Sequence, residues 1–250
     1  MYKTLHGLVL REVKYKESSK ILTILTEEEG KITAEAKGVL RKGSKSAASA
    51  QVPVWSELTF SEYKGRYTLT EGSVLEDFAA LREDLSDFAL ACYFAELLES
   101  TAVEGAPDAP LLHLGLNALF ALSRRLYPPE HIKAVLELRL LSLAGFSPAL
   151  ERCSVCGEEN PAAPWFSLRG GTIRCGHCPR QEEGRSLPLC QASLAAMRHV
   201  CHASPKRIFS FTLDEPSARR FYKACQEFTS VQLDREFRTL DYWQRLQPEK

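Results

Sequence analysis

The stretch GLVLREVKYKESSKILTILTEEEGKITAEAKGVLRKGSK, residues 7–45, decides the fold of the first part of the chain. Three short segments in it are rich in β-branched residues and alternate partly between apolar and polar side chains, which is typical of strands. Glu29 and Gly30 stand at a turn position between the second and third segments. The pattern therefore predicts three consecutive strands followed by a basic loop.

Two more segments of the same kind follow at residues 54–63 and 66–72, with Lys64 and Gly65 at the turn between them. Five strands in fewer than about 80 residues suggest a small antiparallel barrel. A longer connection after the third strand is the pattern of an OB-fold, and an SH3-like barrel remains the alternative on pattern alone. We therefore expect an OB-fold domain at residues 1–78.

From about residue 78 the apolar residues recur every three to four positions, which is the spacing of one helical face. One helix is expected to open near Pro128 and Pro129 and to stop at Gly145. The predicted fold is thus α+β and multidomain, with a helical domain at residues 79–250. Helices are expected in residues 77–100, 110–126, 131–144, 191–203 and 215–232.

The balance of charge limits how the chain can bind a charged partner. Its 250 residues include 32 basic and 32 acidic side chains, so a polyanion must be held by a local patch and not by the global field. No uncharged apolar run reaches about 18 residues, and the first 20 residues carry scattered charges, unlike a signal peptide. These features predict a cytoplasmic protein.

Four cysteines form two C-x2-C pairs separated by eighteen residues, which is the ligand spacing of a structural zinc site. Residues 164–174 between the pairs read as a hairpin with Gly170 and Gly171 at its turn, which would return the second pair to the first. His177 as a substitute ligand and an iron–sulfur cluster remain alternatives. The predicted ligands of one Zn²⁺ ion are Cys153, Cys156, Cys175 and Cys178.

The chemistry of this site is expected to be structural. Four thiolates close the coordination shell, so no position is left for a water molecule that the metal would activate. The site interrupts the helical domain at about residues 150–180, and the other cysteines (Cys92, Cys190, Cys201 and Cys225) read as core residues. Residues 38–45 resemble a P-loop, but Ser44 and Lys45 are transposed. We predict no catalytic residue and no enzyme activity.

Basic residues cluster in the predicted barrel. Residues 31–70 carry seven basic and three acidic side chains, and a second basic run surrounds the first turn. On an OB-fold, such residues can follow a phosphate backbone while aromatic rings stack on unpaired bases. A solvated face without a partner is the alternative. The candidate DNA-binding residues are Arg11, Lys14, Lys16, Lys37, Arg41, Lys42 and Lys45, and the aromatic candidates are Tyr15, Trp55, Tyr63 and Tyr67.

Taken together, these features give the chain a resemblance to the bacterial recombination mediator RecO family of the RecFOR repair pathway. The resemblance runs almost end to end. It rests on residues 7–45, on YTLTE at residues 67–71, on LLSLAGFSPALERCSVCG at residues 140–157, and on the second C-x2-C pair.

The resemblance implies a non-enzymatic DNA repair and recombination protein with an OB-fold, a helical domain and a four-cysteine zinc site. It implies binding of single- and double-stranded DNA, annealing of complementary strands, and association with the nucleoid during repair. It also implies contacts with RecR and with the C-terminal tail of single-stranded DNA-binding protein (SSB), so that RecA is loaded. Candidates for receiving that tail are Arg124, Arg125, Lys133 and Arg139, and an ordinary solvated helix face is the alternative for them. A zinc-bearing OB-fold adaptor, or an RNA- or protein-binding module without a repair role, is the alternative.

Overall fold

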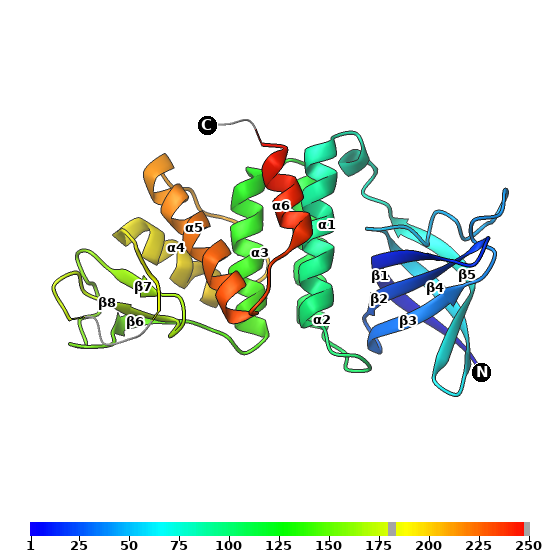
Figure 1. Ribbon diagram of the computed structural model, residues 1–250, viewed down its shortest axis with the longest axis horizontal. Coiled ribbons are helices and arrows are strands. Elements are labelled where there is room, and N and C mark those ends of the chain that lie inside the picture. Colours follow the sequence, from blue (N-terminus) through cyan, green and yellow to red (C-terminus); the bar gives the residue numbers. More distant parts are fainter. Residues whose placement is uncertain (180–183, 248–250) are drawn as a thin grey trace. The chain divides into compact units, whose positions relative to one another are not determined.

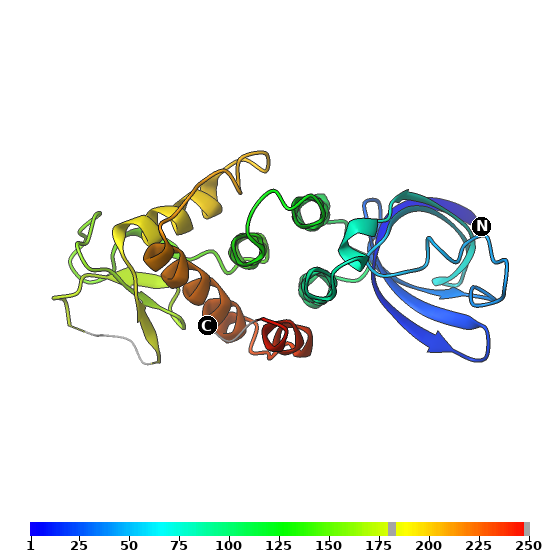
Figure 2. The same ribbon diagram turned by 90° about the horizontal axis from the view of Figure 1, so that it is seen from above.

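Five strands close into a barrel in the computed structural model, which describes residues 1–179 and 184–247 (Figures 1 and 2). The strand order β1-β2-β3-β5-β4 is that of an OB-fold, so the predicted fold is confirmed. The predicted ranges also include residues 180–183 and 248–250, which lie outside the described residues. The strands are β1 (Tyr2–Tyr15), β2 (Ser19–Thr26), β3 (Gly30–Ala36), β4 (Trp55–Tyr63) and β5 (Arg66–Glu76).

Closure of the barrel depends on the long strand β1. Its first half pairs with β4, from Tyr2 to Leu8, and its second half pairs with β2, from Gly7 to Tyr15. A register shift between Val9 and Arg11 lies beside the change of partner, where a bulge can bend the strand. The circle is completed by β3 and β5, which pair in parallel through only two residue pairs.

The barrel interior is filled by alternate side chains of the five strands, including Leu22, Ile24 and Phe60. The connection between β3 and β4 adds Val39 and Ala50 to this core, so it covers the interior.

One glycine allows a close approach outside the barrel. Gly30 has φ +67°, and a Cβ built there would lie 2.0 Å from the Ala106 carbonyl oxygen. The segment that contains Ala106 runs beside β3, where Gly105 N–H donates to the Lys31 carbonyl oxygen at 3.1 Å. Only a residue without a side chain fits against this segment.

Helices pack beside the barrel and form one compact unit with it, Met1–Leu126 with Phe237–Lys250. Asp84 and Asp108 cap two of these helices by accepting hydrogen bonds from backbone N–H groups. The last helix was not predicted, and it buries Trp243 while Phe237 packs edge-on against Tyr93 at 5.5 Å. The elements are η1 (Ala79–Arg82), α1 (Leu85–Thr101), α2 (Ala109–Ser123) and α6 (Arg238–Arg245).

A second compact unit, Tyr127–Glu236, combines three helices with a four-stranded sheet. The predicted hairpin is confirmed, because β7 pairs antiparallel with β8. The sheet packs on α5 through Phe166 and Phe228, whose ring centroids lie 5.0 Å apart. Its elements are α3 (Pro129–Leu143), β6 (Ala149–Cys153), β7 (Trp165–Ser167), β8 (Thr172–Arg174), β9 (Ser186–Pro188), α4 (Gln191–His202) and α5 (Glu215–Gln232).

The compact units group α1, α2 and α6 with the barrel, whereas we predicted domains of residues 1–78 and 79–250. That division stays a prediction. Among the described residues, the helices are all too short or too polar to cross a membrane.

A buried ion pair lies within the second unit. The Lys133 ammonium contacts Glu137 Oε1 at 2.9 Å and Gln226 Oε1 at 3.0 Å, and the two charged side chains are only 3% and 0% exposed. The expectation that Lys133 receives an acidic tail is therefore wrong, because its charge is enclosed and already paired. Arg139 is also engaged, since it donates to the Val200 carbonyl oxygen at 3.2 Å.

This pair gives a testable contrast. We expect Glu137→Leu to lower the free energy of unfolding by about 3–5 kcal/mol, because it leaves the Lys133 charge buried without its partner. The double variant Lys133→Met/Glu137→Leu should recover most of that loss, since no charge remains inside. Urea unfolding followed by circular dichroism measures both.

The matched control is Glu215→Leu, which removes an exposed ion pair of the same i,i+4 spacing with Arg219. It should cost less than about 1 kcal/mol. Equal losses in Glu137→Leu and Glu215→Leu would contradict the importance of burial.

Candidate nucleic-acid interface and metal centre

The two basic groups that lie apart in the sequence come together at one end of the barrel. Leu40 N–H donates to the Ser18 carbonyl oxygen at 3.0 Å, and Gly38 N–H donates to Ser19 Oγ at 3.3 Å. These bonds hold the connection after β3 against the turn between β1 and β2. The pairing of Lys20 with Ala36 in β2 and β3 places both segments at this end.

Six of the seven candidate DNA-binding residues occupy this region, which we call the basic end. All six are exposed. Lys37 has a weak ion pair with Glu35 at 3.9 Å, while the other five have no carboxylate within ion-pair distance among residues 1–179 and 184–247. These five charges are therefore not held in ion pairs within that part of the chain. The basic end consists of Lys14, Lys16, Lys37, Arg41, Lys42 and Lys45.

Arg11 and Lys20 differ from these six. Arg11 Nε lies 3.0 Å from Glu99 Oε1 of α1, and Lys20 Nζ lies 2.8 Å from Glu12 Oε2. Arg11 stays a predicted DNA-binding residue, although its guanidinium already has a partner.

The four aromatic candidates differ in how exposed they are. Tyr63 is 70% exposed at the turn between β4 and β5, and Tyr15 lies under the Lys16 ammonium at 4.8 Å from the ring centroid. Tyr67 is half-buried and donates its hydroxyl to Glu29, and Trp55 is half-buried near His6. Tyr63 thus offers the most accessible ring for stacking.

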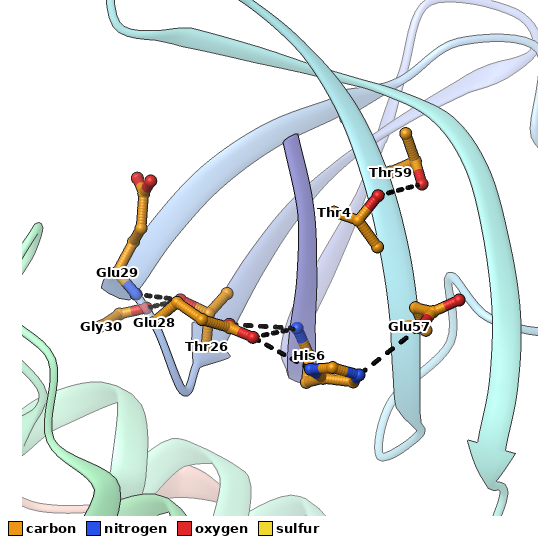
Figure 3. Close-up of polar contacts among 8 residues, drawn as sticks. All are labelled: Thr4, His6, Thr26, Glu28, Glu29, Gly30, Glu57 and Thr59. Carbon is orange, nitrogen blue, oxygen red and sulfur yellow. Dashed lines mark hydrogen bonds and ion pairs between the residues drawn. The ribbon is translucent and has the colours of Figure 1, made fainter. Parts of the chain in front are cut away.

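The far end of β2 carries the opposite charge. Figure 3 shows His6 between Glu28 and Glu57, with Nδ1 at 2.9 Å from Glu28 Oε1 and Nε2 at 3.6 Å from Glu57 Oε2. His6 N–H also donates to Glu28, at 3.1 Å from Oε2. We call Glu27, Glu28 and Glu57 the acidic end. Ligand atoms of His6, Glu27 and Glu28 lie within 4.8 Å of one another, but exposed acidic groups commonly do so without a cation.

The four predicted metal ligands converge in the second unit. Their sulfur atoms lie within 4.8 Å of one another, with 3.9 Å between Cys153 and Cys178 and 3.5 Å between Cys156 and Cys175. Zn–S bonds of about 2.3 Å at tetrahedral angles place sulfur atoms about 3.8 Å apart, so the arrangement fits the ion. His177 is exposed and lies outside this group. Four close cysteines can therefore hold a metal ion here.

Local structure explains why these thiols meet. Cys153 is the last residue of β6, and Cys175 follows β8. These two strands pair in parallel, so their carboxyl ends lie at the same end of the sheet. Burial opposes ionisation of the Cys153 thiol, but backbone N–H groups that donate to its sulfur outweigh burial and lower its pKa to about 6. One of these donors is Cys175 N–H, at 3.3 Å. The site therefore favours the thiolate form at Cys153.

Arg198 is a residue that the sequence analysis missed. From α4 its guanidinium donates to the Leu150 carbonyl oxygen at 2.8 Å, to that of Glu151 at 2.9 Å and to that of Glu159 at 2.7 Å. These carbonyls flank the first cysteine pair, so Arg198 fixes that segment to the helix. An isolated arginine in an amphipathic helix carries no sequence signal for this role.

Comparisons with known proteins cover nearly the whole chain. The family models "Recombination protein O N terminal" and "Recombination protein O C terminal" match residues 1–78 and 82–241. The DNA repair protein RecO of Acetivibrio thermocellus is 30% identical over 236 residues, 94% of each chain. That of Exiguobacterium sibiricum is 36% identical over 195 residues, which are 78% of this chain and 76% of the relative. That of Symbiobacterium thermophilum is 30% identical over 243 residues, 94% of each chain.

We expect Cys175→Ser to abolish the predicted binding of one Zn²⁺ ion per chain and to lower the thermal stability of the second unit. The reason is that three ligands and a neutral hydroxyl cannot replace the four-thiolate shell. Elemental analysis and thermal unfolding measure the two effects. The control Cys201→Ser changes a half-buried cysteine outside the group and should keep its metal. Unchanged metal content in Cys175→Ser, or a brown protein, would contradict the assignment.

The ion pairs of His6 predict a pH dependence. A hydrogen bond with Glu28 raises the pKa of His6, and Glu57 and Glu27 raise it further. A raised pKa stabilises the folded state fully below the unfolded pKa, and this contribution is lost as pH rises through the folded pKa. The melting temperature of His6→Gln should therefore lie furthest below that of the wild type near about pH 6, and the gap should shrink by about pH 9.

In a Glu28→Gln background the same histidine substitution should show a much weaker dependence on pH, because the main cause of the raised pKa is gone. A gap in melting temperature that is equal at both pH values in the native background would rule out the ion pair as its source.

Proposed function

Since the chain belongs to the recombination protein O (RecO) family of DNA repair proteins, we propose that it is a DNA-binding recombination mediator and not an enzyme. In this proposal the basic end binds single- and double-stranded DNA. The observation that carries it is the meeting of two basic segments at one end of an OB-fold, where five of the six side chains have no ion-pair partner among the described residues. The ligand is therefore a polyanion backbone.

Binding of this kind does not depend on base sequence. Lysine and arginine side chains contact phosphates and release counterions, so affinity falls steeply as salt concentration rises. A mediator needs this property because it must act wherever single strands are exposed.

Annealing follows from the same contacts. Two complementary strands repel each other through their phosphates, and a basic surface that binds both backbones lowers that repulsion. Base edges stay free to pair when the protein contacts only the backbone. The reaction needs no nucleophile, general base or nucleotide.

The metal site has a supporting part in this proposal. We assign one Zn²⁺ to the four cysteines, because soft thiolate ligands in a tetrahedral arrangement suit this ion. The closed shell leaves no position for a reacting water molecule. The ion would hold β6 and β8 together, and Arg198 and Phe228 attach this sheet to α4 and α5.

The family resemblance supports the proposed partners. These are RecR, the C-terminal tail of SSB, and DNA on which RecA is loaded, in the cytoplasm and at the nucleoid during repair. Arg124 remains an exposed candidate for the acidic tail, whereas Arg125 contacts Asp87 at 3.2 Å.

The double variant Arg41→Ala/Lys42→Ala tests the basic end. We expect weaker binding to single strands and to duplexes alike, and a slope of log affinity against log salt that is shallower by roughly one for each lost phosphate contact. Strand annealing should slow as well. Fluorescence anisotropy at several salt concentrations and an annealing assay with complementary oligonucleotides measure these effects.

The control is Lys206→Ala/Arg207→Ala, which removes the same charge from an exposed basic pair outside the barrel. It should bind DNA nearly as the wild type does. If the loop variant bound and annealed normally at low salt, the basic end would not be the interface. If the wild type showed no annealing at all, an adaptor role without repair activity would be favoured.

A further inference from the structure

A groove opens beside the contact between β3 and β5 in the barrel. These strands pair only at Ala34 with Tyr67 and at Glu35 with Thr68, so the sheet is open on either side of this short contact. The groove has a volume of about 540 Å³, which lies in the roughly 300–1,000 Å³ range of sites for small molecules. Its size suits one nucleotide unit better than a duplex. We call it the β3–β5 groove.

Tyr63 is the most exposed aromatic residue of this groove. It lies at the turn between β4 and β5, and the Lys64 ammonium lies over its ring, 5.4 Å from the ring centroid. Tyr63 is 70% exposed and so makes few contacts within the folded chain, which means that packing does not explain this residue. Tyr67, by contrast, packs edge-on against Phe60 at 5.7 Å and is held by its hydroxyl.

The charges that line the groove determine whether the base or the phosphate of a nucleotide enters it. Lys37 and Arg66 supply two cations, while Glu35 and Glu104 supply two carboxylates. The Glu35 side chain is 25% exposed and that of Lys37 is 63% exposed, so the anion lies deeper than the cation. A phosphate inside would meet Glu35, whereas a neutral base can donate N–H groups to a carboxylate. The base is thus favoured inside and the phosphate at the rim.

Lys37 connects the groove with the basic end, because it belongs to both. A strand whose backbone follows the basic end therefore passes the mouth of the groove.

We propose that the β3–β5 groove holds one unpaired base of a single DNA strand, stacked on Tyr63, with Lys37 and Arg66 at the adjacent phosphates. This inference rests on the proposed function and adds a means of telling single strands from duplexes. A base inside a duplex is stacked and paired, so it cannot enter. The captured base must leave the groove before it pairs, so stacking on Tyr63 serves binding and not annealing itself.

Tyr63→Ala tests the groove with three labelled probes of equal length, about 16 nucleotides, the upper end of the site size of one OB-fold. The probes are a mixed-sequence single strand, an abasic single strand and a duplex. We expect a roughly 5- to 150-fold loss of affinity for the mixed-sequence strand, the value of one stacked base. Affinity for the abasic strand and for the duplex should stay unchanged. Fluorescence anisotropy measures all three.

Two further variants test whether the aromatic ring of Tyr63 is the cause of the lost affinity. Tyr63→Phe keeps the ring and should bind all probes as the wild type does. Tyr242→Ala removes an exposed tyrosine from α6, outside the barrel, and should have no effect. An equal loss on all three probes, or no loss on the mixed-sequence strand, would overturn the proposal.

The outcome separates this proposal from the proposed function. If Arg41→Ala/Lys42→Ala weakens binding to every probe while Tyr63→Ala weakens none, the basic end stands and the groove does not. If the loop variant has no effect while Tyr63→Ala weakens binding of the mixed-sequence strand alone, the groove binds the base and the phosphate path lies elsewhere.

Discussion

Closure of the barrel depends on the long strand β1, which pairs with β4 and with β2. The first half of β1 bonds to β4 and its second half bonds to β2, so these two registers fix where β4 and β2 lie along β1. The turn after β1 and the connection after β3 then meet at one end, where Leu40 bonds to Ser18. Mutually repelling cations are thus brought together by backbone hydrogen bonds.

Features encoded by neighbouring residues could be predicted from the sequence. Alternation in β2 and β3 and the turn at Gly30 indicated the barrel, because strand propensity and turn chemistry act over a few residues. The spacing of the cysteines indicated a metal site in the same way. The hairpin was predicted from Gly170 and Gly171 as turn residues, and in the structure Gly171 has φ +61°, a backbone conformation that favours glycine.

Features that depend on distant packing could not be predicted. Lys133 was predicted as an exposed residue that could receive an acidic tail, but packing of α5 and α4 against α3 encloses it with Glu137. The helix α6 is short, and its position depends on contacts with α1. The groove beside Tyr63 arises from a parallel pairing of β3 with β5, and no local sequence pattern in either strand predicts that pairing.

The separation of the acidic end from the basic end by the length of β2 has an electrical consequence. A chain with equal numbers of positive and negative groups feels almost no net force from a distant uniform field, yet opposite charges at two ends give the barrel a dipole moment. In the field of the DNA proposed as its ligand, that dipole would experience a torque that turns the Lys42 side toward the phosphates and the Glu28 side away. The proposed binding would then begin from an oriented approach.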